Sequence, residues 1–180
     1  MKRLLLGIFS MASMALAMPT VTQAQTAPKL SHQDTEFLKD AAEAGNAEVA
    51  GSNLAVARSA NADVKSFAKT MINDHDKAAA ELKSLAEQKG VKVSDTPSAA
   101  KRMQIKLLSE RTGASFDQHY AESIGVDAHQ DAVKLFRKEV DKGTDADVKA
   151  WASKTLPTLT HHLEMAQHLK TETAAPVGKR

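Results

Sequence analysis

Four polar residues stand at positions where the surrounding pattern predicts buried apolar side chains. They are Glu48, His75, His129 and His162, and each falls on the apolar stripe of a different expected helix. Imidazole nitrogens and carboxylate oxygens are strong ligands for transition metals, whereas burying such groups without partners is costly. The chain has no cysteine, so His, Asp and Glu are the strong ligands that it offers. We therefore predict a site for one zinc, copper or iron ion.

An interpretation without a metal stays open for the same residues. A core histidine commonly forms a hydrogen bond with a carboxylate or a hydroxyl group, and Asp74 and Tyr120 are the candidates. If a metal binds, these two residues are expected to hold the ligand side chains by hydrogen bonds. The other histidines, and Glu122, are expected on the solvated surface: His32, His119, His161 and His168.

Several kinds of chemistry are excluded or disfavoured by what the chain lacks. Without cysteine there is no thiol catalysis, disulfide scaffold or iron–sulfur cluster. The absence of any Glu-x-x-His motif disfavours a diiron ferroxidase, and no glycine-rich phosphate loop indicates a nucleotide. Of 24 Lys and Arg residues, Lys2 and Arg3 lie in a predicted export signal, so 22 remain against 22 Asp and Glu. A neutral mature chain gives no electrostatic basis for binding nucleic acid.

The elements that must position these residues are helices. With only 8 glycines and 5 prolines, and with much alanine, lysine, glutamate and leucine, the composition is typical of helical proteins. Apolar residues recur at spacings of three and four, and Asn61 is a suitable N-cap. The expected helices occupy residues 34–59, 61–89, 97–141 with an interruption near residue 112, and 145–170.

The third of these stretches carries two apolar faces that do not align at 100° per residue. Phe116 and Tyr120 mark one face, and His129 and Phe136 mark the other. Skipping one residue aligns the two faces, which predicts a π-bulge or kink near Gly125, a feature that often lies beside functional sites. The alternative is a change of packing partner along an unbroken helix.

Two helical hairpins are implied, and together they predict an all-α, antiparallel four-helix bundle over residues 34–170. A short extra helix precedes the third long one. Counted from the turns, the four polar residues lie about 12 to 19 residues along their helices, or roughly 18 to 29 Å, near the middle of the bundle. Pro157 is expected to bend the last helix, because proline removes a backbone hydrogen bond.

The two ends of the chain are not expected to belong to the bundle. Residues 1–24 read as a cleaved signal peptide, with Lys2 and Arg3 before an apolar run and cleavage after Ala24 or Ala17. Residues 25–33 are expected to be flexible, and 171–180 to be a disordered tail. With no second long apolar stretch, we expect no membrane span in the mature chain and a periplasmic location.

Short motifs surround the polar core residues in order along the chain. They are Glu48-Val49, Val64-Lys65-x-Phe67-Ala68, Met71-Ile72-x-Asp74-His75, Phe116-Asp117-x-x-Tyr120, His129-x-x-x-Val133 and Leu156-Pro157-x-Leu159-x-x-His162-Leu163. Over residues 35–169 the chain thereby resembles the bacterial secreted domain-of-unknown-function family 4142. The resemblance implies a ferritin-like fold and matches the polar residues and the proline to the family's recurring positions. Members are often labelled membrane or outer-membrane proteins, which is consistent with export.

Three functions are compatible with these observations. The leading hypothesis is a non-catalytic, stress-related periplasmic bundle whose polar core binds one transition-metal ion. An enzyme using that metal for redox or hydrolytic chemistry is the second. The third is a structural bundle without metal that binds a second copy or another envelope protein, and exposed apolar area between Pro97 and Leu108 would favour it.

Overall fold

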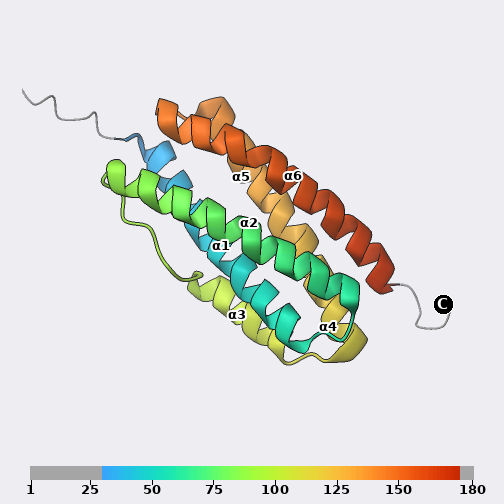
Figure 1. Cartoon of the computed structure of the whole chain (residues 1–180). Coiled ribbons are helices and arrows are strands. Elements are labelled where there is room, and N and C mark those ends of the chain that lie inside the picture. The colour runs from blue at the N-terminus through green and yellow to red at the C-terminus, as the bar shows by residue number, and fades with distance from the viewer. Residues whose placement is uncertain (1–29, 175–180) are drawn as a thin grey trace, which may run out of the picture.

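A computed structural model describes residues 30–174 of the chain, and no strand occurs within them. The predicted signal peptide, residues 25–29 and residues 175–180 lie outside the described residues. The helices are shown in Figure 1. Their bounds are α1 (His32–Arg58), α2 (Ala62–Gln88), α3 (Ala99–Ser109), α4 (Gly113–Tyr120), the π-helix η1 (Ala121–Asp127), α5 (Ala128–Lys142) and α6 (Ala146–Ala174).

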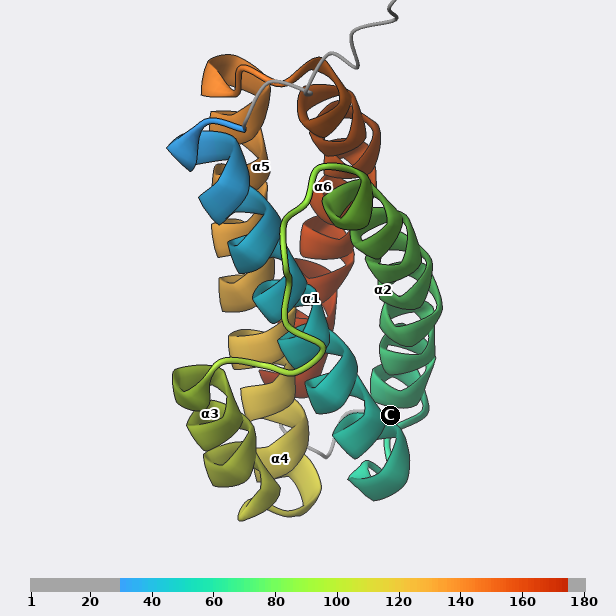
Figure 2. The ribbon, with the colours of Figure 1, turned by 90° about the vertical axis from the view of Figure 1, so that its left-hand side faces the viewer.

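The long helices form the antiparallel four-helix bundle that the sequence predicts. One hairpin is α1 with α2, and the other is α4, η1 and α5 followed by α6. Helix α1 packs against α2 and α5, and α6 packs against α5 and α2, which closes the bundle. The short helix α3 lies outside the bundle, near the end where α4 begins, after a loop that runs along α1 (Figure 2). The all-α fold class is confirmed.

Helix ends follow local capping chemistry, with two corrections to the expected boundaries. Asn61 caps α2 as predicted, because its side chain accepts hydrogen bonds from two backbone N–H groups. Ser31 caps α1 in the same way, so residues 32–33 are helical rather than flexible. At the other end α6 continues to Ala174, so residues 171–174 are not a disordered tail. Pro157 lies inside α6, which continues on both sides of it.

The predicted π-bulge is present as a full π-helical segment, η1, around Gly125. The wider turn restores the register, so that Tyr120 before it and His129 after it are both buried. Gly125 also allows α6 to approach closely, because a Cβ atom placed there would lie 3.0 Å from the Cβ atom of Ala166. The change of register is therefore a backbone feature and not only a change of packing partner.

Two apolar clusters fill the bundle on either side of a polar layer. One cluster is built around Phe37, Phe136 and Trp151, and the other around Phe67 and Phe116. Because the predicted stripes face inward, the polar residues that lie midway along them are buried between these clusters.

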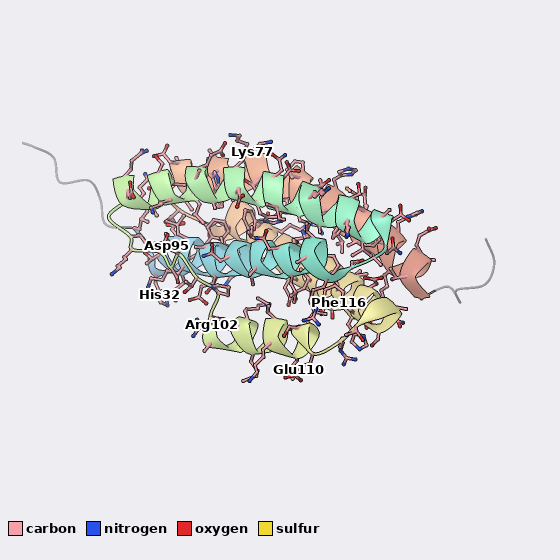
Figure 3. The ribbon with its side chains drawn as sticks, turned by 60° about the horizontal axis from the view of Figure 1, so that its bottom comes forward. His32, Lys77, Asp95, Arg102, Glu110 and Phe116 are labelled. Atoms are coloured by element: carbon pink, nitrogen blue, oxygen red, sulfur yellow. The ribbon has the colours of Figure 1, made fainter. Side chains whose placement is uncertain are left out.

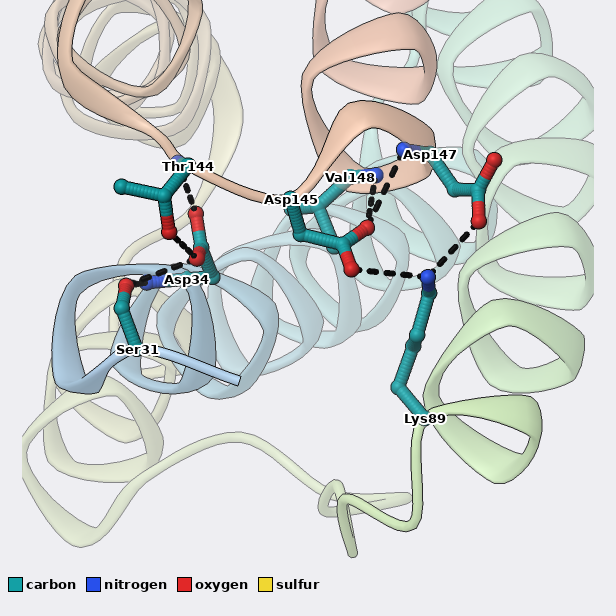
Figure 4. Close-up of polar contacts among 7 residues, drawn as sticks. All are labelled: Ser31, Asp34, Lys89, Thr144, Asp145, Asp147 and Val148. Atoms are coloured by element: carbon teal, nitrogen blue, oxygen red, sulfur yellow. Dashed lines mark hydrogen bonds and ion pairs between the residues drawn. The ribbon is translucent and has the colours of Figure 1, made fainter. Parts of the chain in front are cut away.

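Two acidic residues missed by the sequence analysis join the start of α1 to the end of α5. Asp34 accepts hydrogen bonds from the backbone N–H (2.9 Å) and the hydroxyl (2.6 Å) of Thr144, and a further bond from Ser31 (Figure 4). Glu139 is fully buried beside it and accepts a bond from Gln33. Nearby, Lys89 pairs with Asp145 and Asp147 and ties α2 to the start of α6.

The two carboxyl groups have opposite pKa shifts. Burial alone would raise the pKa of Asp34, but the hydrogen bonds from Thr144 and Ser31 outweigh it and hold that pKa below its usual range. Burial raises the pKa of Glu139 to about 7; the hydrogen bond from Gln33 partly opposes this rise, and nearby Asp34 adds to it. Asp34 is therefore ionised and Glu139 protonated in mildly acidic solution.

We expect Glu139→Gln to remove a pH dependence of stability between about pH 5 and pH 8. The folded state holds the Glu139 proton more tightly than the unfolded chain, so its contribution is present below the unfolded pKa and is lost as pH rises through about 7. Glutamine keeps an acceptor for Gln33 and carries no charge. The free energy of unfolding in urea should be higher in the variant, relative to the wild type, at pH 8 than at pH 5.5. Parallel pH profiles for the two proteins would contradict this assignment.

Candidate metal centre

Three helices bring one histidine each to the middle of the core. His75 comes from α2, His129 from α5 and His162 from α6, and their side chains are 5%, 0% and 2% exposed. The ring centroids are 5.3–5.5 Å apart. One ring nitrogen of each residue lies within 4.8 Å of the others. The structure thus brings together three of the predicted ligands as a compact group.

Glu48 of α1 lies against the edge of the His75 ring that carries Nδ1. The Nδ1 atom of His75 is 3.2 Å from the Oε2 atom of Glu48, and both side chains are buried. A carboxylate favours the tautomer with the proton on the nitrogen that faces it, so we assign the proton of His75 to Nδ1. The Nε2 atom of His75 is left with a free lone pair.

The π-helix orients His129 through its backbone carbonyl groups. The Nδ1 atom of His129 is 2.8 Å from the oxygen of Gly125 and 3.2 Å from that of Ile124. Carbonyl oxygens can only accept, so Nδ1 again carries the proton and Nε2 has the free lone pair. The sequence analysis had marked the bulge at Gly125 but not these carbonyl groups as part of the site.

Asp74 fixes the third ring. The Nε2 atom of His162 is 3.2 Å from the Oδ2 atom of Asp74, whose other oxygen accepts a hydrogen bond from Asn73. The proton of His162 therefore lies on Nε2, and its Nδ1 atom is buried without a hydrogen-bond partner in the described structure. This contact is expected of Asp74 both with a metal and without one, because carboxylates orient histidine side chains in either case.

The three free lone pairs belong to His75 Nε2, His129 Nε2 and His162 Nδ1. The two Nε2 atoms are 3.4 Å apart, yet neither has a proton to donate if both rings are neutral. Two nitrogens that bind a tetrahedral zinc at about 2.05 Å are about 3.3 Å apart. A cation between the rings would satisfy all three lone pairs. A hydrogen bond between His75 and His129 would instead require one of these two rings to carry a second proton and a positive charge.

Burial of the histidine group disfavours a second proton, and therefore a positive charge, on these rings. Burial lowers the pKa of His75, an effect that the neighbouring Glu48 carboxylate partly opposes. Burial and the other two histidines lower the pKa of His162 to about 4, against the opposing effect of Asp74. At neutral pH these two imidazoles are therefore uncharged, which is the form that binds metals.

The remaining predicted residues are placed as follows. Glu48 lies against the Nδ1 edges of His75 and His129, at 3.2 Å and 3.9 Å, and is not one of the three converging groups. The Tyr120 hydroxyl is 2.9 Å from the hydroxyl of Ser52 and belongs to the neighbouring apolar cluster. Burial raises the pKa of Tyr120 above its usual range, so it stays protonated.

Side chains predicted to face the solvent lie away from this centre. His32, His161 and His168 are exposed, and Glu122 pairs with Lys170 at 2.8 Å. His119 is half-buried and hydrogen-bonds the backbone of its own helix. The charged side chain of Lys77 projects outward from the bundle (Figure 3). No helix among residues 30–174 is long and apolar enough to cross a membrane.

Fold and site together define an all-helical bundle protein with a histidine-lined polar core. The chain belongs to the family described as Domain of unknown function (DUF4142), whose model matches residues 19–169. The resemblance found in the sequence motifs is thereby confirmed.

The bundle is also similar to a solved structure of a second family of unknown function. The crystal structure of a DUF305 fragment from Deinococcus radiodurans aligns with a TM-score of 0.71 over 81% of this chain and 99% of that chain. At 13% sequence identity this likeness shows the fold alone. None of the curated proteins compared with the chain matches it.

Proposed function

We propose that this protein is an exported, periplasmic helical bundle that binds one transition-metal ion through His75, His129 and His162. The observation that carries the proposal is the convergence of three buried histidines, in which the Nε2 atoms of His75 and His129 face each other at 3.4 Å and the Nδ1 atom of His162 has no hydrogen-bond partner. The charged and apolar pattern of residues 1–24 supports export, and the absence of excess positive charge in the mature chain agrees with a cation ligand rather than a nucleic acid.

The donor set favours particular metals. Three neutral imidazoles suit zinc, copper and iron, and a compact group of three nitrogens holds one ion. Each imidazole is oriented by an oxygen on its other nitrogen, which raises its basicity and fixes its direction. Glu48 and Asp74 act in this supporting role, and the carbonyl groups of η1 do the same for His129.

Metal analysis of the mature protein, purified from the periplasm without chelators, tests the proposal. We expect close to one equivalent of metal, and a polypeptide mass that corresponds to cleavage after Ala24 or Ala17. Adding the metal back to chelator-treated protein should raise its stability by about 2.7 kcal/mol at a hundredfold excess over Kd. Metal-free protein whose melting temperature ignores zinc, copper and iron would contradict the proposal.

A further inference from the structure

A small cavity in the bundle borders the proposed metal centre. Its volume is about 40 Å³, and its lining includes His75 and His162 but not His129. Small residues of α1 and α2 make the space, because a larger side chain at Ala41, Gly45 or Ala78 would occupy it. Phe136, Trp151 and Leu159 close it on the side of the apolar cluster.

The cavity reaches the surface between α2 and α6. Ala79 and Thr158 also line it, and both side chains are exposed. A small molecule can therefore approach the histidine group from this side without unfolding a helix.

The histidine group has three protein ligands, which leaves a tetrahedral ion one position short. Glu48 and Asp74 also line the cavity, and each is paired with a histidine. Glu48 faces the Nδ1 edge of His75, opposite the Nε2 atom that carries the free lone pair, and Asp74 accepts from His162. Within the described residues, no fourth histidine or carboxylate joins the converging group.

We propose that the bound metal keeps this fourth position for an exogenous ligand of at most about three atoms, held in the cavity. One water needs roughly 10–15 Å³ of such space, so the cavity holds about three waters or one linear triatomic anion. The inference rests on the proposed function, and it makes water, hydroxide and small anions the ligand class. An open position of this kind distinguishes a reactive metal site from a closed structural one.

Azide binding to the cobalt-loaded mature protein tests this inference. Azide replaces a metal-bound water by donating a lone pair to the ion, with no electron transfer, and cobalt(II) reports the exchange in its visible absorption. We expect a saturable spectral change with azide and none with imidazole, whose five-membered ring is too large for the cavity. If cobalt loads fully and azide changes nothing, the open position is wrong while the metal site stands.

Two matched substitutions test whether azide binds in the cavity. Ala78→Leu fills the cavity without altering any proposed ligand, and Ala80→Leu makes the same change at an exposed position of α2 that does not line it. We expect Ala78→Leu to weaken azide binding at least tenfold, and Ala80→Leu to leave it unchanged, with equal cobalt loading in both. Ala78→Val serves if leucine prevents folding.

Equal azide affinity in all cobalt-loaded variants would show that azide does not bind in the cavity. A wild type that loads no cobalt would contradict both the metal site and this inference. Because metal loading is measured before azide is added, the two failures are distinguishable.

Discussion

Replacing His75 by alanine is expected to abolish metal retention during purification. It removes one of three ligands, so the loss of affinity should exceed the 10–100-fold that changing a supporting hydrogen-bond partner typically produces. Metal content by elemental analysis and Kd by competition with a chelator measure the effect. Full metal content in this variant would show that the metal binds elsewhere.

The same substitution should also destabilise the metal-free protein. The Nδ1 atom of His75 is 3.2 Å from the Oε2 atom of Glu48, whose side chain is 2% exposed. Without the imidazole, the Oε2 atom of this buried carboxyl group loses its polar neighbour, at a cost of about 1–3 kcal/mol. The double variant His75→Ala with Glu48→Gln should recover part of this loss in urea unfolding.

A substitution of Asp74 distinguishes a residue that binds the metal from one that only orients a metal-binding histidine. Asp74 is half-buried and contacts His162 only through the Nε2 proton. Asp74→Asn keeps an acceptor oxygen but removes the charge, so we expect a 10–100-fold weaker metal complex that still forms. If Asp74→Asn and His75→Ala lose metal equally, the division between ligands and supporting residues is incorrect.

Acidification should destabilise the metal-free protein through His162. Its pKa falls from 6.5 to about 4 on folding, first because of burial and then because of the other two histidines. The unfolded chain therefore binds the proton more readily, and the contribution present above pH 6.5 is lost as pH falls toward 4. Between pH 7.5 and pH 5 the loss amounts to about 2 kcal/mol.

His162→Gln isolates this effect from the other titrating groups. Glu139 acts in the opposite direction over the same range, but it is present in both proteins and cancels in their difference. Urea unfolding of chelator-treated wild type and variant at pH 7.5 and pH 5 should show the wild type losing about 2 kcal/mol more than the variant. An unchanged difference would mean that folding does not lower the pKa of His162.

Much of the fold could be predicted because helices are local structures. Spacings of three and four placed Val64, Met71 and His75 on one buried face of α2, and Asn61 at its start, without knowledge of any partner. The break in phase between Tyr120 and His129 likewise predicted the π-helical register change. The helix ends near residues 32 and 174 were placed less well, because capping and the final turns depend on contacts that periodicity does not report.

For the candidate site, the sequence by itself determined which residues enter the core and at what height. A rise of 1.5 Å per residue, counted from the turns, puts Glu48 and the three histidines roughly 18 to 29 Å along their helices, near the middle of the bundle. Only the tertiary structure decided their roles, because packing sets the distance between helices and the rotamer of each ring. It placed Glu48 behind His75, aligned two Nε2 atoms at 3.4 Å and left Tyr120 with Ser52. The Asp34–Glu139 pair joins residues 105 positions apart, and no local pattern carries information over that separation.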